Sequence, residues 1–135
     1  MNGLRNTVYD LLRLDTAMNG FGFGPDNVYP NYGAVDPPQY ERFLIIRWGA
    51  RAPGMAGVHP VDVSLWFYEL DPDYTNINNA IKRCRSLIPG LISSSTGDGG
   101  WIVGVEDTGD SPDFFDDAWK RYTRNGTYRI TASGM

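Results

Sequence analysis

This sequence of 135 residues has only one cysteine and one histidine, and it contains no long apolar run. It has one cysteine, Cys84, so no intrachain disulfide can form, and a disulfide-stapled secreted module is excluded. It has one histidine, His59, without the companions that a zinc site or a catalytic triad needs. No apolar run approaches the roughly 20 residues of a membrane-spanning helix. Because the N-terminus also does not resemble a signal peptide, we expect a protein that is made and used in a cytoplasm-like setting, without a membrane partner.

Positive charge is scarce as well. The chain has 12 Lys and Arg against 16 Asp and Glu, which gives a net charge of -4 and a pI of about 4.8. A protein whose main task is to grip nucleic acid needs surplus cations on one face, so this class is disfavoured. The apolar share of 41% and the charged share of 21% fit an ordinary globular protein. We therefore expect a single domain over residues 1–135, large enough to fold without a metal.

The hydrophobic pattern predicts an α+β fold, with one mainly antiparallel or mixed four-stranded sheet and two helices packed on one of its faces. The order of the patterns is helix, two strands, helix, two strands. Val28 and Tyr29 form a predicted brief strand at a sheet edge within a long loop. The predicted helices span 2–15 and 71–88, the strands span 42–49, 61–70, 101–105 and 122–133, and the connections span 19–40, 50–60, 93–100 and 106–118.

Several of these elements make specific predictions about burial. The strand at 42–49 is apolar almost throughout, which indicates that both of its faces are covered. Leu65 lies on the apolar face of an alternating strand, and Ile81 lies on a helical stripe with spacings of three and four. Cys84 belongs to the same stripe, where a free cysteine acts as a small buried hydrophobe. The predicted N-caps are Asn2 for the first helix and Asp71 or Asp73 for the second.

The most informative block runs from residue 109 to residue 122. It holds four aspartates and four aromatic residues, but no histidine, no cysteine and no phosphate-binding glycine pattern. Carboxylates and large rings without a nucleophile are more typical of a contact surface than of catalysis. A hard-cation site is the alternative, although the spacing does not fit an EF-hand, and acid–base catalysis would need a pocket that raises one pKa. The acidic block begins slightly earlier in the sequence, and its carboxylates are Glu106, Asp107, Asp110, Asp113, Asp116 and Asp117.

A second candidate contact surface is basic. Lys82, Arg83 and Arg85 share one flank of the second helix, which predicts either a solvated face or a salt-bridged seam against the acidic block of another copy. Phe21 and Phe23 lie in a glycine-rich stretch that follows a helix and leads to a proline, unlike a nucleotide-binding loop. We expect their rings to fill a core edge or to contact a neighbouring subunit. The candidate interface is therefore Asp110, Asp113, Phe114, Phe115, Asp116, Asp117, Lys82, Arg83, Arg85, Phe21 and Phe23.

The order and spacing of several segments resemble the tail terminator proteins of long, non-contractile-tailed bacteriophages, particularly those that infect actinobacteria. The resemblance spans nearly the whole chain. It rests on the segments Leu4–Leu14, Val28–Pro30, Phe43–Gly49, Leu65–Tyr68, Asp71–Ile77, Thr108–Ser111 and Asp113–Asp117, on Trp101, and on the final strand.

The resemblance implies a structural virion protein that forms a hexameric ring, without catalysis, cofactor or metal. Such a ring would sit at the head-proximal end of the tail tube, stop tube polymerisation and offer a surface to the head–tail connector or stopper protein. It would assemble in the host cytoplasm, and genomic DNA would pass through it without specific binding. The acidic balance of the chain suits such a channel. The alternatives are another neck component (a head-completion or stopper protein), a small metal-dependent enzyme that uses the acidic block, and a host-directed binding module.

Overall fold

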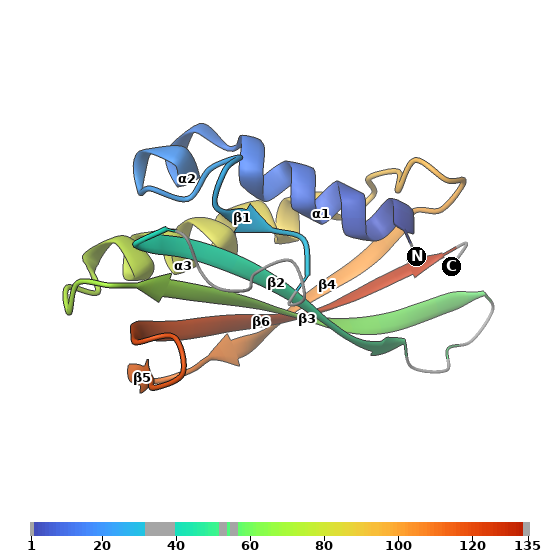
Figure 1. Ribbon diagram of the computed structural model, residues 1–135. Helices are drawn as coiled ribbons and strands as arrows, with labels where there is room; N and C mark the ends of the chain where they lie inside the picture. Colours follow the sequence, from blue (N-terminus) through green and yellow to red (C-terminus); the bar gives the residue numbers. More distant parts are fainter. Residues whose placement is uncertain (1, 32–39, 52–53, 55–56, 134–135) are drawn as a thin grey trace.

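The computed structural model describes residues 2–31, 40–51, 54 and 57–133. Figure 1 shows two layers, with helices above a curved sheet. The elements along the chain are α1 (Asn2–Leu14), α2 (Thr16–Gly20), β1 (Val28–Tyr29), β2 (Arg42–Arg51), β3 (Val58–Glu69), α3 (Thr75–Leu87), the 3-10 turn η2 (Pro89–Leu91), β4 (Ile102–Asp110), β5 (Phe114–Asp116) and β6 (Arg121–Ser133).

The sheet is mixed, and it contains six strands in the order β1-β2-β3-β6-β4, with β5 also pairing with β6. The β1–β2 pair is parallel, while β2–β3, β3–β6, β4–β6 and β5–β6 are antiparallel. The α+β class and the mixed, mainly antiparallel sheet are thus confirmed. The predicted number of four strands is too low, because β5 and the brief edge strand β1, which was predicted at Val28 and Tyr29, are also part of the sheet.

The predicted acidic loop at 106–118 is also corrected. β4 continues through Asp110, and β5 follows after three residues, so much of this block is strand. Register shifts beside Gly104 and Gly109 mark irregularities in the β4–β6 ladder, and Gly109 has a φ of 112° that glycine readily adopts. Polar residues and glycines made the segment look like a loop, whereas pairing with the long strand β6 overrides that local preference.

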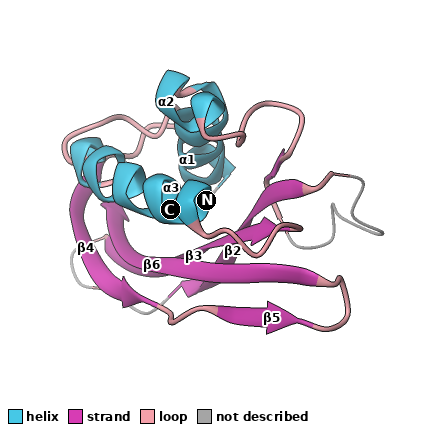
Figure 2. Ribbon diagram, turned by 90° about the vertical axis from the view of Figure 1, so that its left-hand side faces the viewer, coloured by secondary structure: helices cyan, strands magenta, loops and turns pink. Residues whose placement is uncertain are grey.

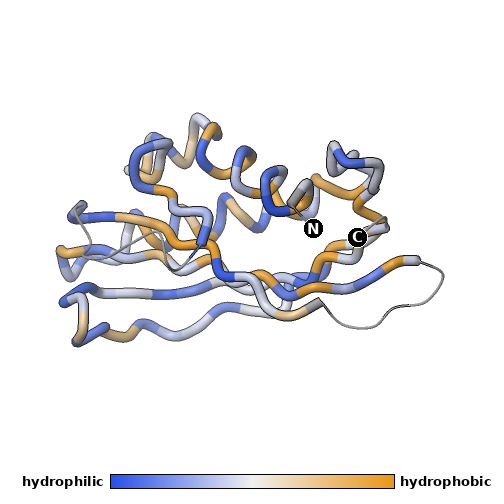
Figure 3. Tube along the Cα trace, turned by 45° about the vertical axis from the view of Figure 1, so that its right-hand side comes forward, coloured by the Kyte–Doolittle hydropathy of each residue, from blue (hydrophilic) through white to orange (hydrophobic). Residues whose placement is uncertain are grey.

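The helices cover one face of the sheet, as Figures 1 and 2 show from two directions. The interface between the layers is a continuous apolar core, and Figure 3 shows hydrophobic residues along the strands and in part of each helix. Burying such side chains is the main driving force for folding. The fully or nearly fully buried members of this core include Leu4, Val8 and Leu12 of α1, Leu44 and Ile46 of β2, Val63, Leu65 and Phe67 of β3, Ile77, Ile81 and Cys84 of α3, and Tyr128 and Ile130 of β6.

A smaller aromatic cluster covers the opposite face of the sheet. Phe43 and Tyr68 stack with ring centroids 4.7 Å apart, and Trp119 meets Phe43 edge-on at 5.7 Å. Ile45 is buried in the same cluster. Both faces of β2 are therefore covered at this end, which confirms the prediction from its continuous apolar run.

The helices differ from prediction at α2 and at the start of α3. A short helix, α2, follows α1 directly, with the Asp15 carboxylate accepting a hydrogen bond from the Met18 N–H as its N-cap. The helix α3 begins at Thr75 with Tyr74 at the N-cap position, where no side chain makes a capping hydrogen bond, so the predicted caps Asp71 and Asp73 are wrong. The Asp73 carboxylate instead accepts hydrogen bonds from the Thr75 N–H and hydroxyl in the turn that leads into the helix. The side chain of Asn2 lies outside the described residues.

The strands β2 and β3 extend further into the predicted 50–60 connection than the glycines and prolines suggested. β3 already includes Pro60, which pairs with Thr131 of β6. The described ladder between β2 and β3 ends at Val61, so Pro60 lies where β3 has lost its β2 neighbour. A proline is tolerated at such an edge because no second ladder needs its missing N–H.

Candidate assembly surface

Half of the predicted acidic block is held by cations of the same chain. The Arg85 guanidinium lies 2.6 Å from the Asp110 carboxylate and 3.3 Å from that of Asp107. Arg124 of β6 lies 2.9 Å from Asp110 and 3.3 Å from Asp113. These pairs join α3, β4 and β6 on the helix side of the sheet. The predicted seam against another copy is therefore corrected for Arg85, Asp110 and Asp113, whose charges have partners within the subunit.

Arg83 is also used within the subunit. Its guanidinium donates to both carboxylate oxygens of Asp15, at 2.9 and 3.1 Å, and so ties α3 to the start of α2. The hydrogen bond from Arg83 is the main cause that holds the pKa of Asp15 below its ordinary value, against partial burial, which acts in the opposite direction. Of the three predicted cations, only Lys82 forms no ion pair with a residue that the structure describes.

The aromatic residues of β5 point to both sides of the sheet. Phe114 packs edge-on against Trp66 on the face away from the helices, with ring centroids 5.9 Å apart. Phe115 packs against Tyr122 at 4.9 Å, and Tyr122 in turn meets Tyr74 beside α3. Both phenylalanines stay substantially exposed, at 39% and 42%. They provide apolar contact area at this end of the molecule.

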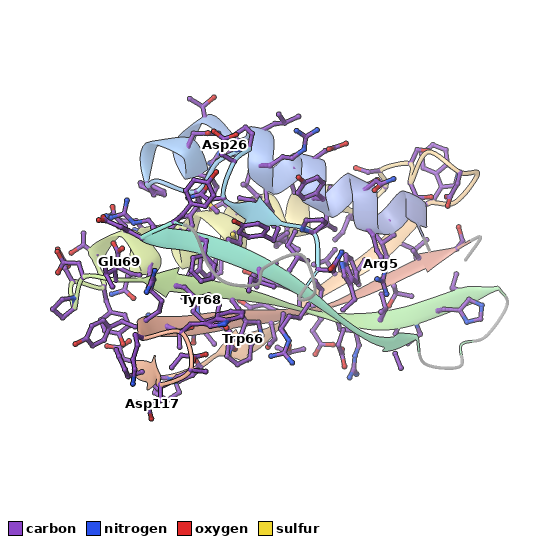
Figure 4. The ribbon with its side chains drawn as sticks, viewed as in Figure 1. Arg5, Asp26, Trp66, Tyr68, Glu69 and Asp117 are labelled. Atoms are coloured by element: carbon purple, nitrogen blue, oxygen red, sulfur yellow. The ribbon has the colours of Figure 1, made fainter. Side chains whose placement is uncertain are left out.

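Asp116 is the last residue of β5, and Asp117 begins the turn that joins β5 to β6. Asp116 accepts a hydrogen bond from the Trp119 N–H at 3.0 Å, which fixes the turn, and Lys120 takes the left-handed φ of 54° that closes it. Asp117 is exposed, and Figure 4 shows it at the outer tip of this end of the sheet. Within the described part of the chain, neither carboxylate forms an ion pair.

The two predicted phenylalanines of the glycine-rich stretch have different roles. Phe23 is fully buried and packs edge-on against Phe67, with ring centroids 5.2 Å apart. Its ring belongs to the core of the single subunit and is not accessible to a neighbour. Phe21 is only partly buried, and it lines a groove of about 360 Å³ together with Asn79, Lys82, Arg83 and Ser86.

Exposed apolar side chains gather at two opposite ends of the sheet. Around β5, Leu70 and Tyr40 join Phe114 and Phe115: Leu70 N–H donates to Glu41 C=O, and Arg121 donates to Tyr40 C=O. At the start of β4, Trp101 and Val103 are 54% and 51% exposed.

Ile92 belongs with this second patch. It is 47% exposed and precedes Ser93, whose N–H donates to Ile102 C=O between Trp101 and Val103. This patch is absent from the predicted contact residues, because Trp101 and Val103 were interpreted only as strand residues. Alternation around the buried Ile102 was the signal that could have placed both side chains outward.

No three or more His, Cys, Asp or Glu side chains in the described part of the chain are placed to hold a metal ion. Cys84 is buried in the core as predicted, and burial raises the pKa of its thiol. His59 lies in β3 opposite Ala132, far along the chain from Cys84. None of the described helices is long and apolar enough to cross a membrane.

Comparisons with known proteins show a shared fold. No family model matches the sequence, and no curated protein matches it either. Among solved structures, the chain is similar to one from the virion of a native gene transfer agent (GTA) particle, with a TM-score of 0.69. The likeness covers 97% of this chain and 95% of that chain, at 16% sequence identity. At that identity the comparison establishes that the two chains have the same fold over almost their entire length.

Proposed function

We propose that this protein is a structural subunit of a phage-type virion, and that it acts as the tail terminator. In this role a ring of subunits, hexameric by resemblance, binds the head-proximal end of the tail tube and stops its growth. The ring then offers its other side to the head–tail connector or stopper protein. Genomic DNA passes through the centre without specific binding, and the ring assembles in the host cytoplasm.

The observation that carries this proposal is the fold shared with a chain of a gene transfer agent virion over nearly the whole of both chains. A partial likeness would fit a common substructure, whereas full-length coverage fits a subunit of the same kind. The sequence resemblance to tail terminators, which rests on different observations, points to the same class of particle.

The distribution of exposed apolar residues supports the same role. A subunit in a ring between tube and neck needs several contact surfaces, and large exposed aromatic residues are typical of the centres of such contacts. The patch around Phe114 and Phe115 and the patch around Trp101 and Val103 lie at opposite ends of the sheet. This arrangement suits a protein that is held between different neighbours.

The proposal is tested with tail tubes. Tail-tube protein of the same particle is polymerised alone and with increasing amounts of this protein, and tube lengths are measured by negative-stain electron microscopy. A terminator shortens the tubes and leaves a ring on one end only. Unchanged tube lengths, together with binding to DNA-filled heads, would instead identify the protein as a head-completion or stopper protein.

A further inference from the structure

The groove next to α3 has an unbalanced positive charge. Phe21, Asn79, Lys82, Arg83 and Ser86 line it, and we call it the basic groove. The Arg83 guanidinium is engaged by Asp15 at one side. Lys82 is exposed and forms no ion pair with a described residue, so its ammonium group is available to a partner. The groove therefore combines one uncompensated cation with the partly exposed ring of Phe21.

The turn after β5 carries the opposite charge. We call residues 116–120 the acidic turn. Among the described residues, the carboxylates of Asp107, Asp110 and Asp113 are held by Arg85 and Arg124, while Asp116 and Asp117 form no such pair. Phe115, directly before this turn, is 42% exposed. The acidic turn thus carries the two carboxylates of Asp116 and Asp117 and one cation, Lys120, so it is acidic by one net charge, and an exposed aromatic ring precedes it.

We propose that the acidic turn of one subunit docks into the basic groove of a second copy of this chain, with Asp117 facing Lys82. This inference deepens the proposed function and rests on it for the self-assembly of the subunit. The occupant of the groove follows from charge and from the aromatic residues on both sides: a carboxylate faces an ammonium group, and Phe115 lies within the same contact as Phe21. Such complementarity sets orientation and partner choice more than total affinity.

The two surfaces belong to different parts of the subunit. The basic groove is lined by Phe21 and by residues of α3, so it belongs to the helix layer. The turn after β5 lies at the end of the sheet on the side away from the helices, as Figures 1 and 2 show. A contact between unlike surfaces is heterologous, so each subunit uses its turn on one neighbour and its groove on the next. Repetition of such a contact closes into a ring when the rotation between subunits allows it.

Single charge reversals test the contact. Lys82→Glu and Asp117→Lys each place like charges opposite one another, and we expect each to weaken self-association by about tenfold or more. Asp26→Lys is a matched control, because Asp26 is exposed and Figure 4 shows it on the helix side, away from the acidic turn. Self-association is measured by light scattering over a range of concentrations, alone and with tail tubes. Circular dichroism checks that each variant is folded.

Mixing the two variants gives the decisive result. In a 1:1 mixture of K82E and D117K chains, the altered groove meets the altered turn, and the unaltered groove meets the unaltered turn. Each contact regains opposite charges, so we expect the mixture to recover self-association that neither variant has alone. The K82E/D117K double variant should recover it as well. A change that acted only within one subunit would not be repaired by mixing.

The outcomes separate this inference from the proposed function. If the wild-type protein assembles and both single variants assemble equally well, the contact is wrong and the terminator role is unaffected. If the mixture recovers assembly but the assemblies do not cap tubes, the contact is right and the terminator role is wrong. A wild-type protein that stays monomeric both alone and with tubes would overturn the contact.

Discussion

The Arg85 guanidinium lies 2.6 Å from the Asp110 carboxylate within the same subunit, and Asp110 also accepts a hydrogen bond from Arg124. One carboxylate therefore joins α3 to β6. Because the pairs are partly exposed, we expect Asp110→Ala to lower the free energy of unfolding by about 1 kcal/mol, measured by urea denaturation. Self-association should not change. Asp26→Ala is the matched control for a lost surface carboxylate, and a loss of assembly by the Asp110 variant alone would show that Asp110 is an interface residue.

The core between the layers makes a second prediction. Leu65 of β3 and Ile81 of α3 are buried, at 0% and 3% exposure. Truncation removes apolar contacts and leaves a cavity, so Leu65→Ala and Ile81→Ala should each cost about 2–5 kcal/mol in urea denaturation. Leu14, which is 59% exposed, serves as the control, and Leu14→Ala should change stability by less than about 0.5 kcal/mol. Equal effects at all three positions would contradict the assignment of the core.

The start of α1 makes a third prediction. The Gly3 N–H donates to the Asp98 carboxylate, and an added methyl group at Gly3 would lie 2.4 Å from the Thr96 carbonyl oxygen. Gly3→Ala should therefore destabilise the protein by about 1–3 kcal/mol through overpacking, despite the better helix propensity of alanine. Gly20 of α2 has no such neighbour, so Gly20→Ala should be neutral or stabilising. Thermal melts of the two variants compare them directly, and a stabilised Gly3 variant would show that the loop around Asp98 does not pack on α1.

Cys84 provides a probe of the folded state. Its thiol is buried, and burial raises its pKa, so the reactive thiolate is scarce in the native protein. We expect iodoacetamide to label the folded protein far more slowly than the same chain in concentrated urea at the same pH. Mass spectrometry of the modified chain measures both rates. Native labelling as fast as that of the unfolded chain would contradict the burial of α3 against the sheet.

The Asp15–Arg83 pair predicts an acid dependence of stability. The pKa of Asp15 is lower in the folded state than its ordinary value of 3.8, mainly because of the hydrogen bond from Arg83. The contribution of the ionised carboxylate is thus complete above about pH 5, and it is lost as the pH falls through the folded-state pKa. Asp15→Asn keeps one side-chain oxygen for the N-cap, and it removes the charge together with one of the two oxygens that accept from Arg83.

The difference in unfolding free energy between wild type and the Asp15→Asn variant is measured by urea denaturation from pH 7 to pH 2. We expect the wild type to be the more stable at neutral pH and the two to converge toward pH 2. A difference that does not depend on pH would show that the charge of Asp15 contributes nothing through Arg83.

Burial was predicted well where apolar periodicity was strong. The alternation around Leu65 and the stripe through Ile81 and Cys84 are set by which face meets the core, and a single sequence carries that information. The acidic segment was predicted poorly because its strand character depends on pairing with β6, a long-range contact that local composition does not reveal. The short strand β5 was missed for the same reason.

The sequence predicted which residue types the candidate interface contains, but not which charges would pair with one another. The sequence identified acidic, basic and aromatic residues, but the partner of each charge depends on the packing of α3 against β4 and β6. For Arg85 the sequence left open a solvated face or a salt bridge to the acidic block of another copy, and the structure pairs it with Asp110 within one chain. Lys82 and Asp117 are of the same charged types, but their positions in the fold leave them without an ion-pair partner among the described residues of the subunit.

The proposed terminator role requires that this chain forms a ring on the end of a phage-type tail tube. Light scattering of the purified protein, with and without preformed tail tubes, measures its native mass, and electron microscopy images the larger species. We expect a closed ring, or a monomer that becomes a ring only on one end of each tube. A protein that stays monomeric and leaves both ends of the tubes bare would show that it is not a ring-forming terminator.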